Sequence, residues 1–479
     1  MGHRDRHHVV IAGGGVAALE TMLALGALAG HLVDITLLSP AREFVYRPVT
    51  VAEAFDIAEA RTYDLAEILA DQGGRELVHD MLGAVDPAGR VAITASGRRI
   101  PFDALVVAVG AVPRAGVPNA LTFRGRADVP ALRGILEDLV VRRARSIAFA
   151  LPSERIWPLP LYELAMMTAG YVRERGSDPV TITLVTPEED PLELFGPAAA
   201  AAMLPLLSAR GIAVRSSSLP ASVRERTLLL VGGGEISADR VITLPVPEGP
   251  NVPGLPQDEH GFIPVDTFGR VSGLEHVYAA GDVTTFPLKQ GGLAAQQADA
   301  VASSVAAQAG AGVAPKPFAP VLRGLLLTGG APLYLRAEPQ RRPRETTIAI
   351  EAHRLRGTRR DISAAGGQAL WWPPAKIAGR YLAPYLATAR STPLAAGVLA
   401  DRVPVPGPPV SDEEQRDALE LALLLADSDA RWGDYASALN ALDAAEALQG
   451  ALPPEYEAKR RAWLAEEQLG AAGVGELAP

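Results

Sequence analysis

The chain has 479 residues, of which 48% are hydrophobic and 21% are charged, and its formal net charge is −10 at pH 7. This length accommodates two or three domains with cores of their own, and the composition is ordinary for a soluble globular protein. The negative charge gives no electrostatic reason to expect a nucleic acid as a partner. Because the chain contains no cysteine, disulfide bonds, thiolate metal sites, redox dithiols and thiol nucleophiles are excluded.

The N-terminal segment MGHRDRHH leads directly into the strand-like run VVIAGGG. It lacks the apolar region and the small-residue cleavage site of a secretory signal. No uninterrupted run approaches the ~18 apolar residues of a transmembrane helix, so we expect a cytoplasmic protein. His7 and His8 have no second pair of metal ligands nearby, and we expect them in a solvated N-terminal arm.

The first part of the chain has the pattern of a β-α-β unit. The run VVIAGGGVAALETMLAL at 9–25 changes from a short apolar strand to helical periodicity across three glycines, and VDITLLSP at 33–40 predicts the next buried strand. FDALVVAVGAVP predicts another strand, and HVYAAGDV with the long helix after it returns to the same domain. We therefore assign residues 1–115 and 251–317 to one β-α-β domain in two parts.

A second β-α-β pattern occupies residues 116–250, where TLLLVGGGEISADRVITL predicts a hairpin that turns at GGGE. The expected fold class is therefore α/β, with two Rossmann-like three-layer dinucleotide-binding domains. Residues 318–402 predict a C-terminal α+β segment, and the proline-rich residues 403–410 predict a linker. Residues 411–479 predict an α-helical tail, in which GDYASAL has the spacing of one tetratricopeptide helix pair.

Two segments leave alternatives open. A single helix pair cannot bury its apolar face alone, so the tail must pack on the body, on a protein partner or on its own copy. In LWWPPAKIAGRYLAPYLA, Trp371 and Trp372 are expected either to pack in a core or to cover an aromatic substrate. The third alternative for this segment is a membrane surface, with Lys376 and Arg380 pointing outward.

A G-x-G-x-x-G/A motif lies between a predicted strand and a predicted helix, in the residues Gly13, Gly14, Gly15, Val16, Ala17 and Ala18. The first glycine permits the tight turn, and Gly15 lets the backbone approach a pyrophosphate at the helix N-terminus. Strand, spacing and helix agree, so the motif predicts dinucleotide binding. The acidic residue that usually ends the second strand is replaced by Ser39. We therefore expect ribose contacts from the Ser39 hydroxyl, a backbone group or Arg42.

A second motif, Gly281-Asp282, follows a strand and precedes a helix. Together with the N-terminal glycines and with VVAVGAVP, which contains Gly110, it resembles the FAD-dependent pyridine nucleotide-disulfide oxidoreductase-like flavoproteins with two dinucleotide-binding domains. That group includes type II NADH dehydrogenases, sulfide:quinone oxidoreductases and flavocytochrome c sulfide dehydrogenases. The resemblance implies non-covalent FAD, bound by both motifs, by Gly110 and by the residues near Ser39.

The resemblance also implies roles for individual residues. The aspartate that matches Asp282 hydrogen-bonds the flavin ribityl chain, and the following helix points its positive end at the isoalloxazine. Lys289 and Gln290 fall near the pyrimidine edge of the flavin, where a lysine stabilises negative charge; a solvated loop lysine is the alternative. Gln296 and Gln297 fall where type II NADH dehydrogenases place glutamines near the quinone, and surface-helix positions are their alternative.

The second domain departs from the family pattern in FALPSERIWPLPLYELA at 149–165, which contains three prolines and no glycine. Each proline removes an amide donor from the expected nucleotide loop. The loop more nearly resembles the cysteine-proline loop of the sulfide-oxidising branch, with Trp157 where the cysteine is expected, so sulfide-to-disulfide chemistry is excluded. Glu163 resembles the glutamate of type II NADH dehydrogenases. Glu188 is expected either to bind a nicotinamide ribose or to lie in a solvated loop.

These features predict an FAD-dependent oxidoreductase that passes two electrons through the flavin, with Lys289, Trp157 and Gln290 as its candidate catalytic residues. NAD(P)H is the leading donor, and a quinone-like or other small molecule is the acceptor. One alternative is a flavoenzyme that oxidises a small substrate directly beneath Trp157 without nicotinamide. The other is a non-catalytic flavin-holding protein that uses residues 411–470 as its partner surface. We also expect a homo-oligomer, and peripheral membrane contact at 371–386 is left open.

Overall fold

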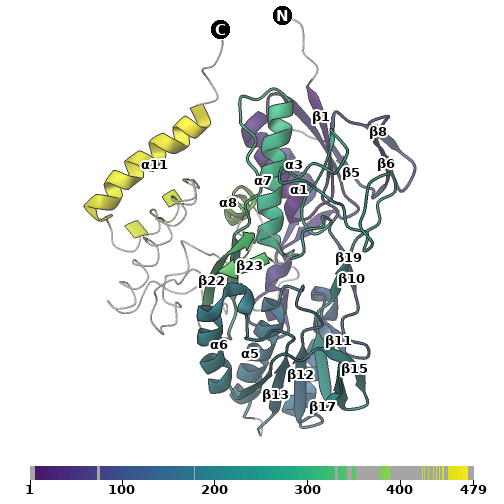
Figure 1. Cartoon of the computed structure of the whole chain (residues 1–479), viewed down its shortest axis with the longest axis vertical. Helices are drawn as coiled ribbons and strands as arrows, with labels where there is room; N and C mark the ends of the chain where they lie inside the picture. The colour runs from purple at the N-terminus through teal and green to yellow at the C-terminus, as the bar shows by residue number, and fades with distance from the viewer. Residues whose placement is uncertain are drawn as a thin grey trace, which may run out of the picture.

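A computed structural model describes residues 6–72, 76–176, 179–329, 333–341, 348–351, 376, 379–388 and 451–472, with isolated positions between 423 and 446. Two α/β parts lie one above the other in Figure 1. Both are built on a parallel five-stranded sheet.

The first sheet has the strand order β20-β9-β1-β2-β5 and is parallel throughout. Its strands are β1 (His7–Ala12), β2 (Val33–Leu38), β5 (Glu76–Val78), β9 (Ala104–Val107) and β20 (Val277–Ala279). The helices α1 (Val16–Ala29) and α7 (Gly291–Gln308) pack together over one face, as Figure 1 shows. Because β20 comes from late in the chain, residues that follow the second sheet complete the first one.

The other face of the first sheet is covered by an antiparallel sheet of β6 (Leu82–Asp86), β7 (Val91–Thr94) and β8 (Arg99–Pro101). Alternate residues of β1 therefore enter two separate cores: Val9 packs beneath the helices and Val10 beneath the antiparallel sheet. Between β2 and β5 lie β3 (Glu43–Val45), η1 (Arg47–Val49), α2 (Thr50–Glu53), β4 (Thr62–Asp64) and α3 (Leu65–Asp71).

The expected solvated arm ends earlier than predicted, because His7 and His8 already belong to β1. The His8 Nε2 atom lies 2.9 Å from the Thr36 hydroxyl on the neighbouring strand, and the His8 amide donates to Asp103. Pairing with β2 orders these histidines. The polar character of the N-terminal sequence does not indicate this pairing.

The second sheet has the order β11-β18-β12-β13-β14 and is also parallel. Its strands are β11 (Leu121–Thr122), β12 (Ser146–Ala150), β13 (Thr181–Val185), β14 (Ile212–Arg215) and β18 (Arg240–Thr243). Its helical elements are η2 (Arg126–Asp128), α4 (Val129–Val140), α5 (Leu159–Glu174), η3 (Glu193–Phe195) and α6 (Pro197–Ala209). Both sheets confirm the predicted Rossmann-like α/β class.

The predicted hairpin is present: β16 (Thr227–Leu230) and β17 (Gly234–Ser237) pair antiparallel, and β15 (Pro220–Arg224) pairs with β16. Two further strands, β10 (Val112–Arg114) and β19 (Val246–Glu248), form an antiparallel pair where the chain passes between the two α/β parts. The crossing segments therefore stabilise each other through backbone hydrogen bonds.

After α7 the chain forms an antiparallel sheet of β21 (Leu322–Leu326), β22 (Leu333–Arg341) and β23 (Ile348–Glu351), and later α8 (Leu382–Thr388) and α11 (Pro454–Ala472). Trp371, Trp372 and the linker at 403–410 lie outside the described residues. So does most of the tail at 411–479, whose tetratricopeptide-like pattern stays a prediction. Within the described ranges, no helix combines the length and hydropathy needed to cross a bilayer.

The start of α8 is held by a side chain from the first helix. Glu20 on α1 is fully buried, and its carboxylate accepts hydrogen bonds from the Tyr381 amide at 2.8 Å and the Leu382 amide at 2.7 Å. Leu382 and Leu386 then pack into the core beneath α1 and α7. Helix α8 is thus an integral element of the first part.

Candidate functional site

The glycine turn between β1 and α1 leaves open space at the carboxyl end of the first sheet. Gly13 has φ +136°, and a Cβ atom there would collide with the Ala108 carbonyl, so only glycine fits. Gly15 is exposed, and nothing lies within 4 Å of the position that its Cβ would take. The gap in front of Gly15 can therefore admit a group that approaches the backbone.

The N-terminus of α1 offers free donors at this gap. Gly15 caps the helix without any side-chain hydrogen bond. The amides of Val16, Ala17 and Ala18 have no acceptor within the helix, as in the first turn of any α-helix, and Ala17 and Ala18 have buried side chains. Free amides and the positive end of the helix dipole together favour a phosphate group.

The second predicted motif meets the first. Gly281 has φ +81°, and a Cβ there would lie 3.0 Å from the Ala17 Cβ and 3.4 Å from the Ala294 Cβ. The turn after β20 is therefore wedged between the first turns of α1 and α7. Asp282 follows directly, and no donor among the described residues hydrogen-bonds its carboxylate. Burial raises the pKa of Asp282, against the opposing charges of Lys289 and Arg47.

The Lys289 ammonium stabilises the loop that leads from this turn to α7. It donates hydrogen bonds to the carbonyl oxygens of Thr284 and Phe286, the latter at 2.7 Å. Burial lowers the pKa of Lys289 to about 8, while the carboxylates of Asp282 and Asp258 oppose that shift. Lys289 thus carries a dissociable proton close to Asp282, and its predicted contact with the flavin stays a prediction.

Gln290 caps α7. Its Oε1 atom accepts from the Leu293 amide at 2.7 Å, and its Nε2 atom donates to the Arg323 carbonyl at 3.1 Å. The side chain therefore joins α7 to β21 and satisfies an amide in the first turn of the helix. Its predicted catalytic role stays a prediction.

Of the three sources expected for ribose contacts, the Ser39 hydroxyl is already engaged. It is buried, donates to the Ala41 carbonyl at 3.1 Å and accepts from the Ala41 amide at 3.2 Å. Arg42 beside it is exposed, which favours Arg42 or a backbone group for the ribose. Gly110, three residues after β9, has φ +77° and open space at its Cβ position.

The second sheet lacks the equivalent donors. Pro158 precedes the first residue of α5, Pro160 has no amide hydrogen, and the amides of Leu161 and Tyr162 both donate to the Pro158 carbonyl. The distances are 2.9 Å for Leu161 and 3.5 Å for Tyr162. Of the first three residues of α5, only Leu159 keeps a free amide, so this turn cannot bind a pyrophosphate as α1 can.

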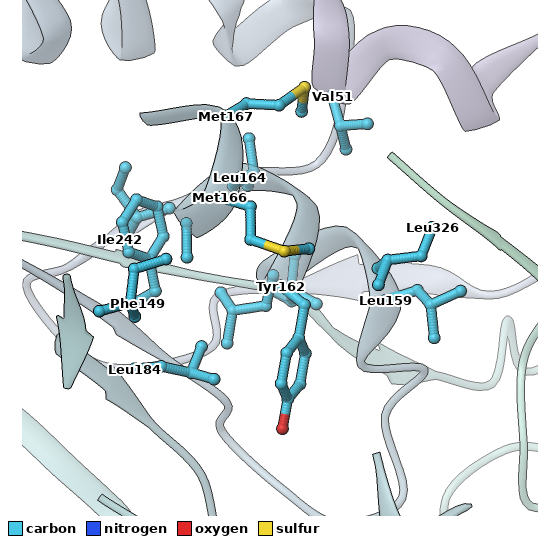
Figure 2. Packing of buried hydrophobic residues seen from close by; sticks show 14 of the residues in the cluster. Val51, Phe149, Leu159, Tyr162, Leu164, Met166, Met167, Leu184, Ile242 and Leu326 are labelled. Carbon is cyan, nitrogen blue, oxygen red and sulfur yellow. The ribbon is translucent and has the colours of Figure 1, made fainter. Parts of the chain in front are cut away.

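The Tyr162 side chain packs in the core of the second part and reaches Glu188, which follows β13. Tyr162 is fully buried, and Figure 2 shows its ring among Phe149, Leu184 and Leu159 with the hydroxyl pointing away from Met166 and Met167. The carboxyl ends of their strands are where open α/β sheets bind their ligands. Tyr162 therefore places a buried ring and a hydrogen-bonded hydroxyl at this edge of the second fold.

The Tyr162 hydroxyl donates to a carboxylate oxygen of Glu188 at 2.6 Å, and the Thr186 hydroxyl donates to the same oxygen at 2.8 Å. Glu188 is only 4% exposed, so the expected solvated loop is wrong at this residue. Burial raises the pKa of Glu188 to about 7, and the hydrogen bonds from Tyr162 and Thr186 oppose the shift.

Trp157 lies two residues before the start of α5 and is half-buried. Its ring meets Phe195 edge to face, with the centroids 5.5 Å apart, and packs on the core of the second part. Lys289 and Gln290, by contrast, belong to the loop that leads into α7 of the first part. The role of Trp157 toward a substrate stays a prediction.

A buried ion pair that the sequence does not reveal joins both parts of the protein. The Lys376 Nζ atom lies 2.6 and 2.8 Å from the two carboxylate oxygens of Glu163 and 2.9 Å from the Pro48 carbonyl of η1. The side chains of Lys376 and Glu163 are 8% and 0% exposed, so the alternative that points Lys376 outward is wrong. Burial raises the pKa of Glu163, and the Lys376 ammonium opposes that shift.

The two glutamines of α7 bind the protein's own backbone. The Gln296 side chain accepts from the Val321 amide at 2.8 Å and donates to the Val321 carbonyl at 2.9 Å. Gln297 accepts from the Gly281 amide at 2.6 Å and is buried. The surface-helix alternative is therefore wrong for Gln297.

Fold and site together define a flavoprotein with two dinucleotide-binding folds, of which the first retains its binding turn. A sequence model of the pyridine nucleotide-disulphide oxidoreductase family matches residues 7–141 and 163–308, more than half of the chain. The chain belongs to this family of FAD-dependent oxidoreductases. The unmatched residues between the two segments include the altered loop before α5.

Several solved structures share the fold. A sulfide:quinone oxidoreductase from Aquifex aeolicus is 21% identical, with a TM-score of 0.65 over 72% of this chain and 87% of that one. A ferredoxin reductase from Rhodopseudomonas palustris is 20% identical, with a TM-score of 0.53 over 70% and 82%. An NAD-dependent persulfide reductase from A. fulgidus is 17% identical, with a TM-score of 0.52 over 67% of this chain and 62% of that one. No curated protein sequence matches the chain.

Proposed function

We propose that this enzyme passes two electrons through FAD to a quinone-like or other small acceptor. The electrons come from a small donor that reaches the flavin directly. The observation that carries the proposal is the contrast between its two dinucleotide folds. The turn before α1 has open space and free amides, whereas the first turn of α5 has few free amides, because of Pro160 and the bonds to the Pro158 carbonyl, and contains the buried Tyr162. The absence of cysteine removes any thiol from the electron path.

The residues of the first fold fit the cofactor. The amides at Gly15 to Ala18 would hold the pyrophosphate, Arg42 or a backbone group the ribose, and Asp282 the ribityl hydroxyls. FAD supplies two-electron redox chemistry when bound. The chain binds and orients it, and Lys289 holds a proton with a pKa of about 8 close to Asp282.

NAD(P)H is the second candidate for the donor. It is favoured by membership of the family and by the described NAD dependence of the similar persulfide reductase. Nicotinamide would then have to bind without the usual contacts, because the first turn of α5 offers one free amide and Glu188 is already hydrogen-bonded. The name of the Aquifex aeolicus enzyme likewise favours a quinone as the acceptor.

Anaerobic mixing of the purified holoprotein with NADH, and separately with NADPH, tests the donor. Absorbance near ~450 nm first establishes that flavin is bound; a colourless protein would instead support the non-catalytic alternative. We expect bleaching by either nucleotide to be no faster than in a control without donor, while dithionite bleaches the flavin fully. Bleaching by one nucleotide well above that control would establish NAD(P)H as the donor.

The proposal also includes a homo-oligomer and a helical tail that contacts a partner or packs on the body.

A further inference from the structure

We propose that Gln297 is a positioning residue for Asp282, the aspartate of the flavin site. Gln297 lies in the second turn of α7 and is only 6% exposed. Its Oε1 atom accepts a hydrogen bond of 2.6 Å from the Gly281 amide, one residue before Asp282. Gln297 therefore acts on the backbone that presents the aspartate.

Beyond Asp282 the turn that follows β20 is held to Ile263, whose amide donates to the Val283 carbonyl at 2.9 Å and whose carbonyl accepts from the Thr285 amide at 3.0 Å, so Gln297 acts at the Gly281 end of the turn. The Ala280 amide makes the last bond to the sheet, to the Val107 carbonyl, and the chain then leaves the ladder. At the far side of the turn, the Thr284 amide and hydroxyl donate to the Gly281 carbonyl at 3.1 and 3.0 Å. The Gln297 Nε2 atom lies 3.4 Å from the Thr284 hydroxyl. One side-chain amide thus contacts both ends of the turn.

Loss of the Gln297 acceptor would move Asp282. Without it, the Gly281 amide would be buried with no acceptor, which is costly. The turn can regain a partner only by shifting, and its φ of +81° at Gly281 and the close Ala17 and Ala294 side chains restrict that shift. A displaced Gly281 displaces the adjacent Asp282, whose carboxylate accepts no hydrogen bond from the described residues that would fix it.

Gln296 provides a matched control on the same helix. Its side chain makes three hydrogen bonds, to the Val321 amide and to the carbonyls of Val321 and Gly292. None of these groups belongs to the turn that carries Asp282. Replacing the side-chain amide of Gln296 therefore removes comparable hydrogen bonds and leaves the hydrogen bond of the Gly281 amide intact.

The test is the FAD dissociation constant of the full-length chain, measured by fluorescence as flavin-depleted protein is titrated with FAD. Gln297→Met keeps the length of the side chain but lacks the acceptor, and we expect it to weaken FAD binding by about tenfold or more. Gln297→Glu keeps an oxygen that accepts from the Gly281 amide, and we expect binding within about threefold of the parent. Gln296→Met should also stay within about threefold.

Equal losses in Gln297→Met and Gln297→Glu would overturn the proposal, as would parent-like affinity in Gln297→Met or a tenfold loss in Gln296→Met. Circular dichroism of each flavin-depleted variant establishes that it is folded. Should Gln297→Met fail to fold, Thr284→Val removes the hydroxyl that bonds Gly281 and contacts Gln297. It should weaken FAD binding several-fold, and an unchanged constant would refute the role of this turn. None of these measurements depends on the identity of the electron donor.

Discussion

The Tyr162 hydroxyl donates a hydrogen bond of 2.6 Å to the Glu188 carboxylate, and both side chains are buried at the carboxyl ends of the second parallel sheet. In dinucleotide-binding folds an acidic side chain at this edge accepts a hydrogen bond from a ribose hydroxyl. Here a hydroxyl of the chain itself occupies that acceptor.

Burial of Glu188 makes stability depend on pH. Its pKa is raised from 4.5 to about 7, so the folded state binds a proton that the unfolded state releases. The resulting contribution to the free energy of unfolding is fully present below the pKa of Glu188 in the unfolded state and is lost as the pH rises through about 7. In the parent protein the free energy of unfolding should fall by up to about 3 kcal/mol as the pH rises over this range, and Glu188→Gln should abolish that fall.

Urea unfolding between about pH 5 and pH 8 measures this decline. Glu189→Gln is the matched control, because Glu189 is exposed beside Glu188 and should leave the slope unchanged. Parallel pH profiles for the parent and Glu188→Gln would contradict the expectation.

Gly15→Ala and Gly13→Ala should separate binding from folding. The Gly15 backbone is extended and its Cβ position is empty, so alanine there should cost the flavin-free protein less than about 1 kcal/mol yet weaken FAD binding through its methyl group. Gly13→Ala should cost about 2–5 kcal/mol, because of its positive φ and the collision with Ala108. Urea unfolding and FAD titration of both variants check this. Parent-like FAD affinity in Gly15→Ala would mean that the gap at Gly15 is not the cofactor site.

Asp282→Ala should reduce retention of the flavin. A carboxylate that accepts hydrogen bonds from ribityl hydroxyls contributes roughly 1.5–3 kcal/mol, so affinity should fall at least about tenfold. The amide oxygen of Asp282→Asn should restore part of it. The measurement is the ratio of flavin to protein absorbance after purification, with the exposed Asp34→Ala as the control. Full occupancy in Asp282→Ala would exclude this aspartate from the site.

Removing one member of the Glu163–Lys376 pair should lower the free energy of unfolding more than removing both members. Lys376→Met leaves a fully buried carboxylate without its cation and should cost about 3–5 kcal/mol of unfolding free energy. Glu163→Gln combined with Lys376→Met should regain much of that loss, which a double-mutant cycle of urea unfolding measures. The exposed Arg6–Asp34 pair is the control, because Arg6→Met should cost under about 1 kcal/mol. Strictly additive effects at Glu163 and Lys376 would show that the pair is not coupled.

Features encoded by near neighbours in the chain could be predicted from the sequence. The glycine turn before α1, the alternation of strands and helices and the hairpin at GGGE all depend on residues within a few positions of one another. The loop before α5 belongs here too, since the loss of amide donors follows directly from its prolines.

Features that depend on distant contacts could not be predicted. Glu188 stands beside other acids, which indicates a solvated loop, but Tyr162 from α5 covers it. Lys376 looks like a surface cation in its local sequence, and its partner Glu163 lies 213 positions away. Periodicity shows that a face is buried without showing which remote side chain will meet it.

The hydrogen bonds of Glu20 make folding of the first part depend on the order in which the chain is synthesised. The second sheet is complete once Thr243 has been made, so it can close while the chain is still growing. The first sheet must wait for β20, and the Glu20 carboxylate, made at the outset, gains the amides of Tyr381 and Leu382 only 361 and 362 positions later. At roughly 5–20 residues per second, that wait is on the order of tens of seconds on the ribosome. The part that begins the chain is therefore among the last to finish folding.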